Sequence, residues 1–366
     1  MTYRSKALCL TLACLWVLSG CSRKNADNAD ICQFTRQILQ NEYPEQMNLL
    51  HNSSKPSIQG ELSLIGDEKL LEEYHDLFLG YDVRDNVDGR TVSDGLPDFA
   101  GESFSFVPLK AEQGSDSLSL MRQRETLVKV SLALLDTVYH VSPYDMNGLG
   151  RRLPSKALVL CDPSFLIDGY QDIDTLLRAS SSSVMLFSPL ALSLDQAFER
   201  LGRNKVNAGI IVDSTICPLS RYAQAFSHYT ARGLSSGSKC YTLPSNASDS
   251  LMHRLVSSYS SISDEPLDCI IVDDLSLDVY SLKNELADML SVLNESSMTY
   301  GKMLSDDFVL IISSEVLART LYDSMREDNL FTHNIAKPTG VNYYASEPQV
   351  GALSSLILIS GNYVQN

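Results

Sequence analysis

Short apolar segments alternate with longer amphipathic segments from residue 103 to about residue 360. The short segments place Val, Ile and Leu at consecutive positions, which is typical of strands buried on both faces of a parallel sheet. The longer segments repeat apolar residues at helical spacing, as Leu282, Leu286 and Met289 do within 278–293. Strands separated by helices of this length predict an α/β fold with helices on both faces of the sheet.

The pattern also predicts where the elements lie. Strands are expected at 103–109, 156–161, 183–187, 206–212, 239–243, 267–272 and 308–312. Helices are expected at 33–42, 68–79, 117–139, 172–179, 193–201, 218–232, 248–258, 278–293 and 315–326. The apolar segment 351–359 fits either a helix or a strand. Residues 103–366 are numerous for one core, so we expect two lobes there, preceded by a segment, 31–102, whose structure the pattern leaves open.

The first 20 residues have the pattern of an export signal. Arg4 and Lys6 precede an apolar run over 7–18, which is shorter than the roughly 20 apolar residues that cross a membrane. The run ends in Leu18-Ser19-Gly20-Cys21, which resembles the lipobox of bacterial lipoproteins. We therefore expect a signal peptide at 1–20, cleavage after Gly20, and acyl chains such as palmitate on Cys21. The alternative is an ordinary secretory peptide with a chance cysteine.

Such a lipoprotein is held at the bacterial cell envelope, on the inner or the outer membrane, through the lipid on Cys21. Residues 21–30 are polar and are expected to form a tether. Cleavage removes Arg4 and Lys6 and no acidic residue, so the net charge changes from −16 to −18. An acidic chain repels nucleic-acid backbones and anionic lipids, which excludes nucleic acid as a partner and leaves the lipid as the membrane contact.

The cysteines and histidines show no pattern of a metal, redox or disulfide site. No C-x-x-C occurs, no histidines lie at metal-ligand spacing, and the common hydrolase and P-loop signatures are missing. Cys161 and Cys269 lie within apolar strand-like segments, where cysteine usually acts as a small buried apolar residue. We therefore expect no cofactor and no metal, and the missing signatures argue against an enzyme.

An acidic segment at 82–98 contains Asp82, Asp94 and Asp98. It does not fit an EF-hand, because a register with Gly89 at the turn puts Arg84 at the first ligand position. We expect a solvated, turn-rich connection, with a less regular calcium site as the alternative.

Residues 206–215, 220–233 and 239–243 form a strand, helix and strand that resemble a βαβ unit of the type I periplasmic-binding-protein fold. The resemblance implies two lobes of parallel sheet around a cleft and a small polar solute as ligand. One departure is that Trp16, the one tryptophan, lies in the signal, so a sugar would have to stack on Tyr or Phe.

Polar residues follow most of the predicted strands. In parallel α/β sheets ligands bind beyond the carboxyl ends of the strands, so these residues are the candidate ligand-binding site. Helix capping is the alternative for each one, because Asp and Ser are preferred caps. The carboxylates favour a ligand with hydroxyl or amine groups. The candidates are Asp162, Ser164, Ser188, Asp213, Ser214, Asp273, Asp274, Ser313 and Ser314.

Three functions follow from these observations. The main expectation is a lipid-anchored envelope protein that binds a small polar solute without chemistry. The first alternative is an envelope hydrolase or metal-dependent enzyme that uses the acidic loops. The second is an accessory or assembly lipoprotein with an envelope protein partner and no small ligand.

The anchor can be tested by substitution. Cys21→Ser removes the thiol that carries the lipid, so we expect loss of lipid labelling and release into the soluble envelope fraction. Cys32→Ser is the control and should stay membrane-bound and labelled. Membrane retention of the Cys21→Ser protein in fractionation would contradict the lipobox assignment.

Overall fold

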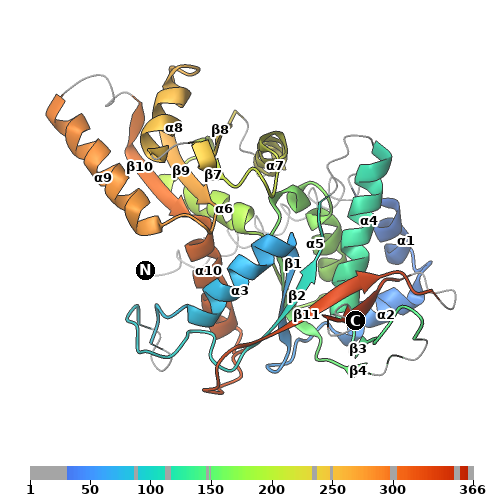
Figure 1. Cartoon of the computed structure of the whole chain (residues 1–366). Helices are drawn as coiled ribbons and strands as arrows, with labels where there is room; N and C mark the ends of the chain where they lie inside the picture. Colours follow the sequence, from blue (N-terminus) through green and yellow to red (C-terminus); the bar gives the residue numbers. More distant parts are fainter. Residues whose placement is uncertain are drawn as a thin grey trace, which may run out of the picture.

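Two lobes of parallel sheet, each covered by helices, make up the structure (Figure 1). The computed structural model describes residues 31–85, 90–111, 117–145, 148, 150–232, 237–247, 250–296, 303–349 and 355–361. The predicted α/β fold is confirmed. Cys21, the signal and the tether lie outside the described residues, so lipidation stays a prediction. Within the described ranges no helix is both long enough and apolar enough to cross a membrane.

Lobe one contains a six-stranded sheet in the order β12-β11-β2-β1-β5-β6. Neighbouring strands are parallel except β11 and β12, which are antiparallel. The bounds are β1 Glu61–Gly66, β2 Ser103–Pro108, β5 Ser155–Leu160, β6 Met185–Phe187, β11 Thr339–Ser346 and β12 Ile357–Ser360. A separate short hairpin consists of β3 Val138–Tyr139 and β4 Gly150–Arg151.

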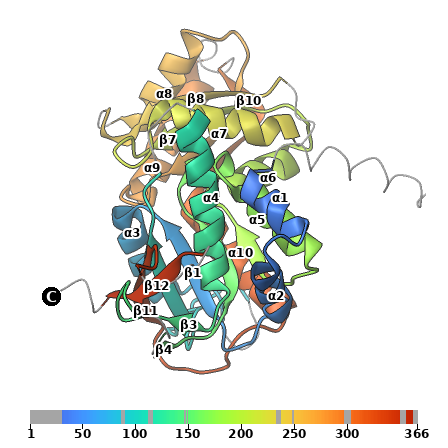
Figure 2. The ribbon, with the colours of Figure 1, turned by 90° about the vertical axis from the view of Figure 1, so that its right-hand side faces the viewer.

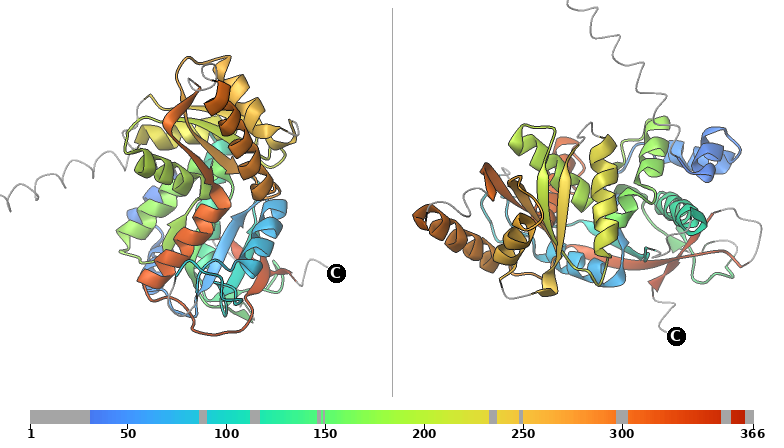
Figure 3. Two further views of the ribbon diagram at one scale, coloured as in Figure 1. Left: turned by 90° about the vertical axis from the view of Figure 1, so that its left-hand side faces the viewer. Right: turned by 90° about the horizontal axis from the view of Figure 1, so that it is seen from above.

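Helices cover both faces of this sheet. In Figure 2, α4 runs along the near side of the molecule, with α1 and α2 beside it. One face packs against α1 Gln33–Leu39, α2 Pro44–Asn52, α4 Ser117–Leu134 and α5 Tyr170–Ala179. The other face packs against α3 Glu68–Gly80 and α10 Ser313–Glu327. The left view of Figure 3 shows α3 and α10 next to each other below lobe two.

Lobe two contains a parallel four-stranded sheet in the order β10-β9-β7-β8. Its strands are β7 Asn207–Val212, β8 Lys239–Pro244, β9 Leu267–Asp273 and β10 Leu304–Ile312. One face packs against α6 Pro189–Leu201 and α7 Leu219–Arg232. The other packs against α8 Leu251–Ser260 and α9 Val279–Ser296. Two 3-10 turns, η2 Pro163–Leu166 and η3 Ser245–Ala247, complete the elements used below.

The chain crosses between the lobes twice. Helix α6 leads from β6 of lobe one into β7 of lobe two, and α10 leads from β10 back to lobe one. The two helices pack together, with Ser193 Oγ donating to Ser313 Oγ at 3.0 Å and Arg319 donating to the side chain of Gln196 at 2.9 Å. These two crossovers fix how the carboxyl ends of the two sheets face each other.

The N-terminal segment differs most from expectation. Residues 31–102 are not separate from the lobes, because β1 lies inside the sheet of lobe one between β2 and β5. The predicted domain boundary at residue 103 therefore falls between two strands of one sheet and is wrong. The sequence of β1 lacks an uninterrupted apolar run, because Ser63 lies among the apolar residues and the strand starts with Glu61, whose charge is paired with the buried Arg152.

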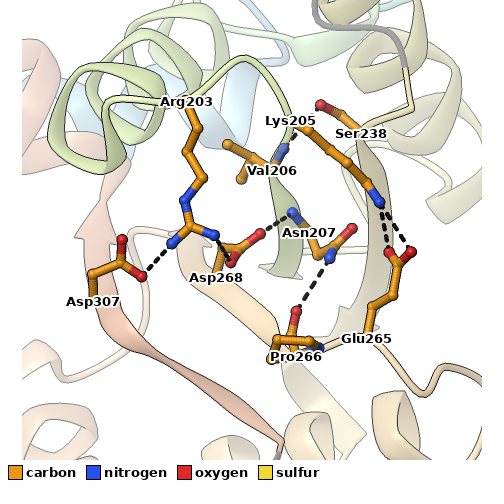
Figure 4. A network of polar contacts seen from close by, with 9 residues as sticks. All are labelled: Arg203, Lys205, Val206, Asn207, Ser238, Glu265, Pro266, Asp268 and Asp307. Carbon is orange, nitrogen blue, oxygen red and sulfur yellow. Dashed lines mark hydrogen bonds and ion pairs between the residues drawn. The ribbon is translucent and has the colours of Figure 1, made fainter.

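The amino ends of the lobe-two strands carry a charge network, drawn in Figure 4. Asp268 is 3% exposed and accepts from the Arg203 guanidinium at 2.9 Å and from the Asn207 backbone N–H at 2.7 Å. Arg203 also contacts the exposed Asp307. Both carboxylate oxygens of Asp268 accept hydrogen bonds from within the protein, so this network stabilises the fold and is not a candidate site.

We expect Asp268→Ala to lower the free energy of unfolding by roughly 1–3 kcal/mol, because the buried Asn207 N–H loses its acceptor. Asp307→Ala removes an exposed partner of the same arginine and should cost much less. Urea unfolding of both variants measures the difference. Equal costs would show that burial of Asp268 does not govern the network.

Candidate active site at the seam between the lobes

The carboxyl ends of β5, β7 and β9 meet where the lobes face each other, in the region called the seam below. A cavity of about 10 Å³ lies in the seam. That volume is about enough for one water molecule. Polar and sulfur-bearing side chains from both lobes line it, among them Glu73, Cys161, Asp213, Tyr222, Asp273 and Asp274.

Asp213, which directly follows β7, joins the lobes through an ion pair. Its Oδ2 lies 2.6 Å from Nζ of Lys69 on α3, and its Oδ1 accepts from the backbone N–H and the hydroxyl of Thr215. Burial alone would raise the pKa of Asp213, but the hydrogen bonds from Lys69 and Thr215 outweigh burial and lower it. Asp213 is therefore ionised and serves to hold the seam closed.

Lys69 has a second carboxylate neighbour, Glu73, one helical turn further along α3. The Lys69 Nζ to Glu73 Oε1 distance is 3.8 Å. Burial raises the pKa of Glu73, and the nearby Asp274 and Asp213 charges raise it further, against the opposing effect of Lys69. Two carboxylates beside one ammonium thus have pKa shifts of opposite direction.

Asp273 ends β9, Asp274 follows it directly, and the two differ in their partners. Asp273 accepts from the Tyr222 hydroxyl at 2.7 Å, and burial raises its pKa against that hydrogen bond and one from Ser313. Asp274 Oδ1 accepts from the N–H and hydroxyl of Ser276, whereas its buried Oδ2 has no hydrogen-bond partner in the described part of the chain. A buried oxygen without a donor carries an uncompensated desolvation cost, so Asp274 Oδ2 is suited to hold a ligand or water.

Asp162 and Ser164 lie at the edge of the seam but serve local structure. Asp162 caps η2 by accepting from the Ser164 N–H at 2.8 Å and from its hydroxyl at 2.6 Å. Burial raises the pKa of Asp162 to about 6 against these hydrogen bonds. Its neighbours Cys161 and Pro163 line the small cavity, whereas Asp162 itself does not.

The other predicted residues do not join the small cavity. Ser188 precedes α6 without capping it, and Ser214 is partly buried beside Asp213. Ser313 is buried at the start of α10 and bonded to Ser193, and Ser314 faces a second, larger cavity. Of the nine predicted residues, Asp213, Asp273 and Asp274 converge in the small cavity. Capping, the alternative for each one, accounts for Asp162.

The second cavity has a volume of about 790 Å³ and lies beside the first. Glu73 and Leu275 belong to the walls of both cavities. Its other walls come from α3, the segment after α3 and the amino ends of α9 and α10. They include Leu77, Tyr81, Arg84, Val279, Ser314 and Arg319. Burial raises the pKa of Tyr81 to about 12, so its hydroxyl stays protonated as a donor.

Sequence reasoning missed Lys69, Glu73 and Arg319. The missing signal was β1: once a strand at 61–66 is recognised, α3 becomes the helix after a central strand, and its first turns belong at the seam.

The cysteines and the acidic segment do not supply chemistry here. Burial raises the pKa of Cys161 well above its usual value and also raises that of Cys217, so neither is a ready thiolate. Among the described residues, no group of three or more His, Cys, Asp or Glu side chains could hold a metal ion. In the segment 82–98, Asp82 and Asp98 accept from nearby backbone N–H groups, as in a turn-rich connection.

Comparison with known proteins gives a fold likeness only. No protein-family model and no curated protein sequence matches the chain. The matching solved structures include glutamate racemase of Francisella tularensis subsp. tularensis SCHU S4 in complex with D-glutamate, at 11% identity, a TM-score of 0.44, and coverage of 80% of this chain and 90% of that one. Glutamate racemase isoform RacE1 of Bacillus anthracis matches at 12% identity and a TM-score of 0.44, covering 78% and 89%.

A third match is glutamate racemase of Campylobacter jejuni subsp. jejuni, at 11% identity and a TM-score of 0.39, covering 79% of this chain and 94% of that one. At these values the likeness concerns the α/β fold, and no residue role is carried over. The structures that match are those of enzymes, glutamate racemases, and not of solute receptors. The expectation of a solute-binding protein without chemistry is therefore wrong. The resemblance to type I periplasmic binding proteins stays a prediction.

The raised pKa of Asp162 predicts a pH dependence of stability. The folded protein holds this proton up to about pH 6 and the unfolded chain only up to about pH 4, so Asp162 stabilises the fold at low pH and loses that contribution as the pH rises. Relative to wild type, Asp162→Asn should gain up to about 3 kcal/mol of unfolding free energy between about pH 4 and 6.

The measurement is urea unfolding of both proteins across this pH range. Asp278→Asn is the control, because Asp278 is exposed and hydrogen bonds from Ser281 lower its pKa, which gives the opposite slope. A pH-independent difference between Asp162→Asn and wild type would contradict the prediction.

Proposed function

We propose that this chain is a lipid-anchored envelope hydrolase whose active site is the seam between the lobes. One observation carries the proposal: Glu73 lies in the wall of both cavities, and the smaller one is also lined by Asp274, which has a buried oxygen without a donor among the described residues. The arrangement provides a place for one water, a place for a substrate, and carboxylates between them.

Asp274 is the proposed general base. Asp274 lines the small cavity, and its Oδ2 is the one oxygen of that carboxylate left without a donor among the described residues, so a water that enters the cavity is the donor we assign to it. Lys69 lies close enough to add a positive charge, since the Asp274 charge contributes to raising the pKa of Lys69. The water therefore faces a proton acceptor with a cation near it, which favours the developing hydroxide.

Asp274 is also the proposed proton carrier. As water oxygen bonds to the electrophilic carbon, Asp274 takes the water proton. It then gives this proton to the leaving oxygen or nitrogen as the bond from carbon to that atom breaks. One water is consumed, and the Asp274 carboxylate is regenerated. Glu73, in the wall shared by the two cavities, positions the substrate between them.

The proposed step uses carboxylates, a lysine and one water. The active-site residues come from α3 in lobe one and from the end of β9 in lobe two. The Lys69 to Asp213 ion pair joins the lobes beside them. We infer that substrate enters the large cavity and reaches the water when this ion pair loosens.

The test is hydrolysis of leucyl-leucine and of leucine ethyl ester in heavy-oxygen water, followed by mass spectrometry. Wild type should release leucine with one heavy oxygen. Asp274→Asn should lower kcat by about 10²- to 10⁴-fold, the usual contribution of a general base. Glu73→Gln should mainly raise KM, because Glu73 positions the substrate.

Glu72→Gln is the matched control, because Glu72 is exposed on the same helix, next to Glu73, and lines neither cavity. It should leave kcat unchanged. Absence of hydrolysis of both compounds by wild type, or equal rates in wild type and Asp274→Asn, would overturn the proposal.

A further inference from the structure

The large cavity carries charges of opposite sign on separate elements. Arg319 comes from α10, and Glu73 comes from α3, which packs beside α10 on the sheet of lobe one. The cavity volume of about 790 Å³ lies within the usual range for small-ligand sites, roughly 300–1,000 Å³. A molecule in this cavity would meet a cation at one wall and a carboxylate at another.

Arg319 is the cation available to a ligand. Among the described residues its guanidinium has one side-chain partner, the neutral amide oxygen of Gln196 at 2.9 Å. The other arginine of the cavity, Arg84, is bonded to the Asp323 carboxylate at 3.1 Å. In a chain of net charge −16, an arginine that lines a cavity without a carboxylate partner retains its capacity to bind an anion.

Glu73 is the carboxylate most available to a cation. Of the three acidic side chains that line the cavity, Asp76 is 87% exposed beside His75, and Glu315 is paired with Lys283 at 3.0 Å. Glu73 is less exposed, at 21%, and its contact with Lys69 is long at 3.8 Å. An ammonium group of a ligand would complete the pairing that Lys69 leaves weak.

The wall also contains apolar side chains, from Leu77, Val83, Leu275 and Val279. An apolar group of the ligand can pack against them and so be removed from water, which adds to affinity. Together, the charged and apolar walls of the cavity fit a ligand that has an ammonium group, a carboxylate and an apolar body.

We propose that the large cavity binds a short zwitterionic peptide, with its carboxylate on Arg319, its ammonium on Glu73 and its apolar side chains against Leu77 and Val279. The statement that this peptide is hydrolysed rests on the proposed function. The statement that it binds does not. A peptide held by Glu73 has its amide near the wall shared with the small cavity.

Binding can be measured separately from turnover with the Asp274→Asn protein, which lacks the proposed base. The probes for calorimetry are leucyl-leucine, leucyl-leucinamide, which lacks the carboxylate, and acetyl-leucyl-leucine, which lacks the ammonium. We expect leucyl-leucine to bind about 10- to 100-fold more tightly than either blocked form, as for loss of a charge-assisted hydrogen bond.

A second substitution, Arg319→Gln, assigns the carboxylate contact. It should make leucyl-leucine and leucyl-leucinamide bind equally, while selectivity against the acetylated form stays. Arg200→Gln, an exposed arginine on α6 that does not line the cavity, should change neither selectivity.

The outcomes separate the two proposals. Selective binding of leucyl-leucine with no hydrolysis by wild type would refute the proposed hydrolase and still support the peptide site. Hydrolysis with equal affinity for the free and amidated peptides, or no binding of any of the three probes, would overturn the peptide site.

Discussion

Carboxylates from two lobes share one small volume at the seam, and the structure around the seam compensates their charge. Parallel strands place the residues that follow them at one edge of each sheet, and the two crossovers turn these edges toward each other. Asp213, Asp273 and Asp274 are thereby brought around a cavity of about 10 Å³. Unpaired charges buried together are costly, so each carboxylate needs a donor, a cation or a proton. Lys69 supplies a cation to Asp213, and the Tyr222 hydroxyl donates to Asp273. Burial raises the pKa of Glu73, which favours its protonated form.

Charged pairs elsewhere in the fold show what a structural pair looks like in this protein. Lys156 and Glu102 are fully buried in lobe one, with Nζ to Oε2 at 2.5 Å, and Nζ also donates to the carbonyls of Ile58 and Leu330. Every donor of Lys156 is therefore used. Asp268 in lobe two is likewise satisfied on both oxygens. Asp274 differs because one of its buried oxygens has no donor in the part of the chain that the structure describes, which is why we place chemistry at the seam rather than at these pairs.

The seam also connects the proposed chemistry to motion between the lobes. The contact that closes it, Lys69 with Asp213, joins a half-exposed lysine to a mostly buried aspartate. Such a pair is worth little when one partner reaches solvent, so this contact can break at modest cost. Opening would admit substrate to the water-sized cavity, and closing would exclude bulk water from it. A lipid on Cys21, as proposed, would keep this reaction at the envelope membrane.

Local pattern was sufficient for the elements of lobe two and much of lobe one. Runs such as 206–212 and 267–272 are apolar on both faces, so they could only be buried strands of a sheet covered on two sides, and the structure confirms them as β7 and β9. The sequence also identified Asp213, Asp273 and Asp274 as strand-end residues, because that inference needs only the position of the strand. The lipobox is likewise a local signal. The place of β1 and the composition of the two cavities were decided by tertiary structure alone.

Strand β1 was hard to recognise from the sequence, because the charge of its first residue, Glu61, is compensated by Arg152, 91 positions further along the chain. The sequence around Glu61 gives no sign of a partner this far along the chain. For the same reason, only folding brings Glu73 and Arg319 to one cavity and reveals that Asp162 is used in capping its own turn. The sequence thus determined which residues stand at strand ends. Which of them share a cavity, and which retain an unpaired oxygen, depended on how the two crossovers orient the sheets.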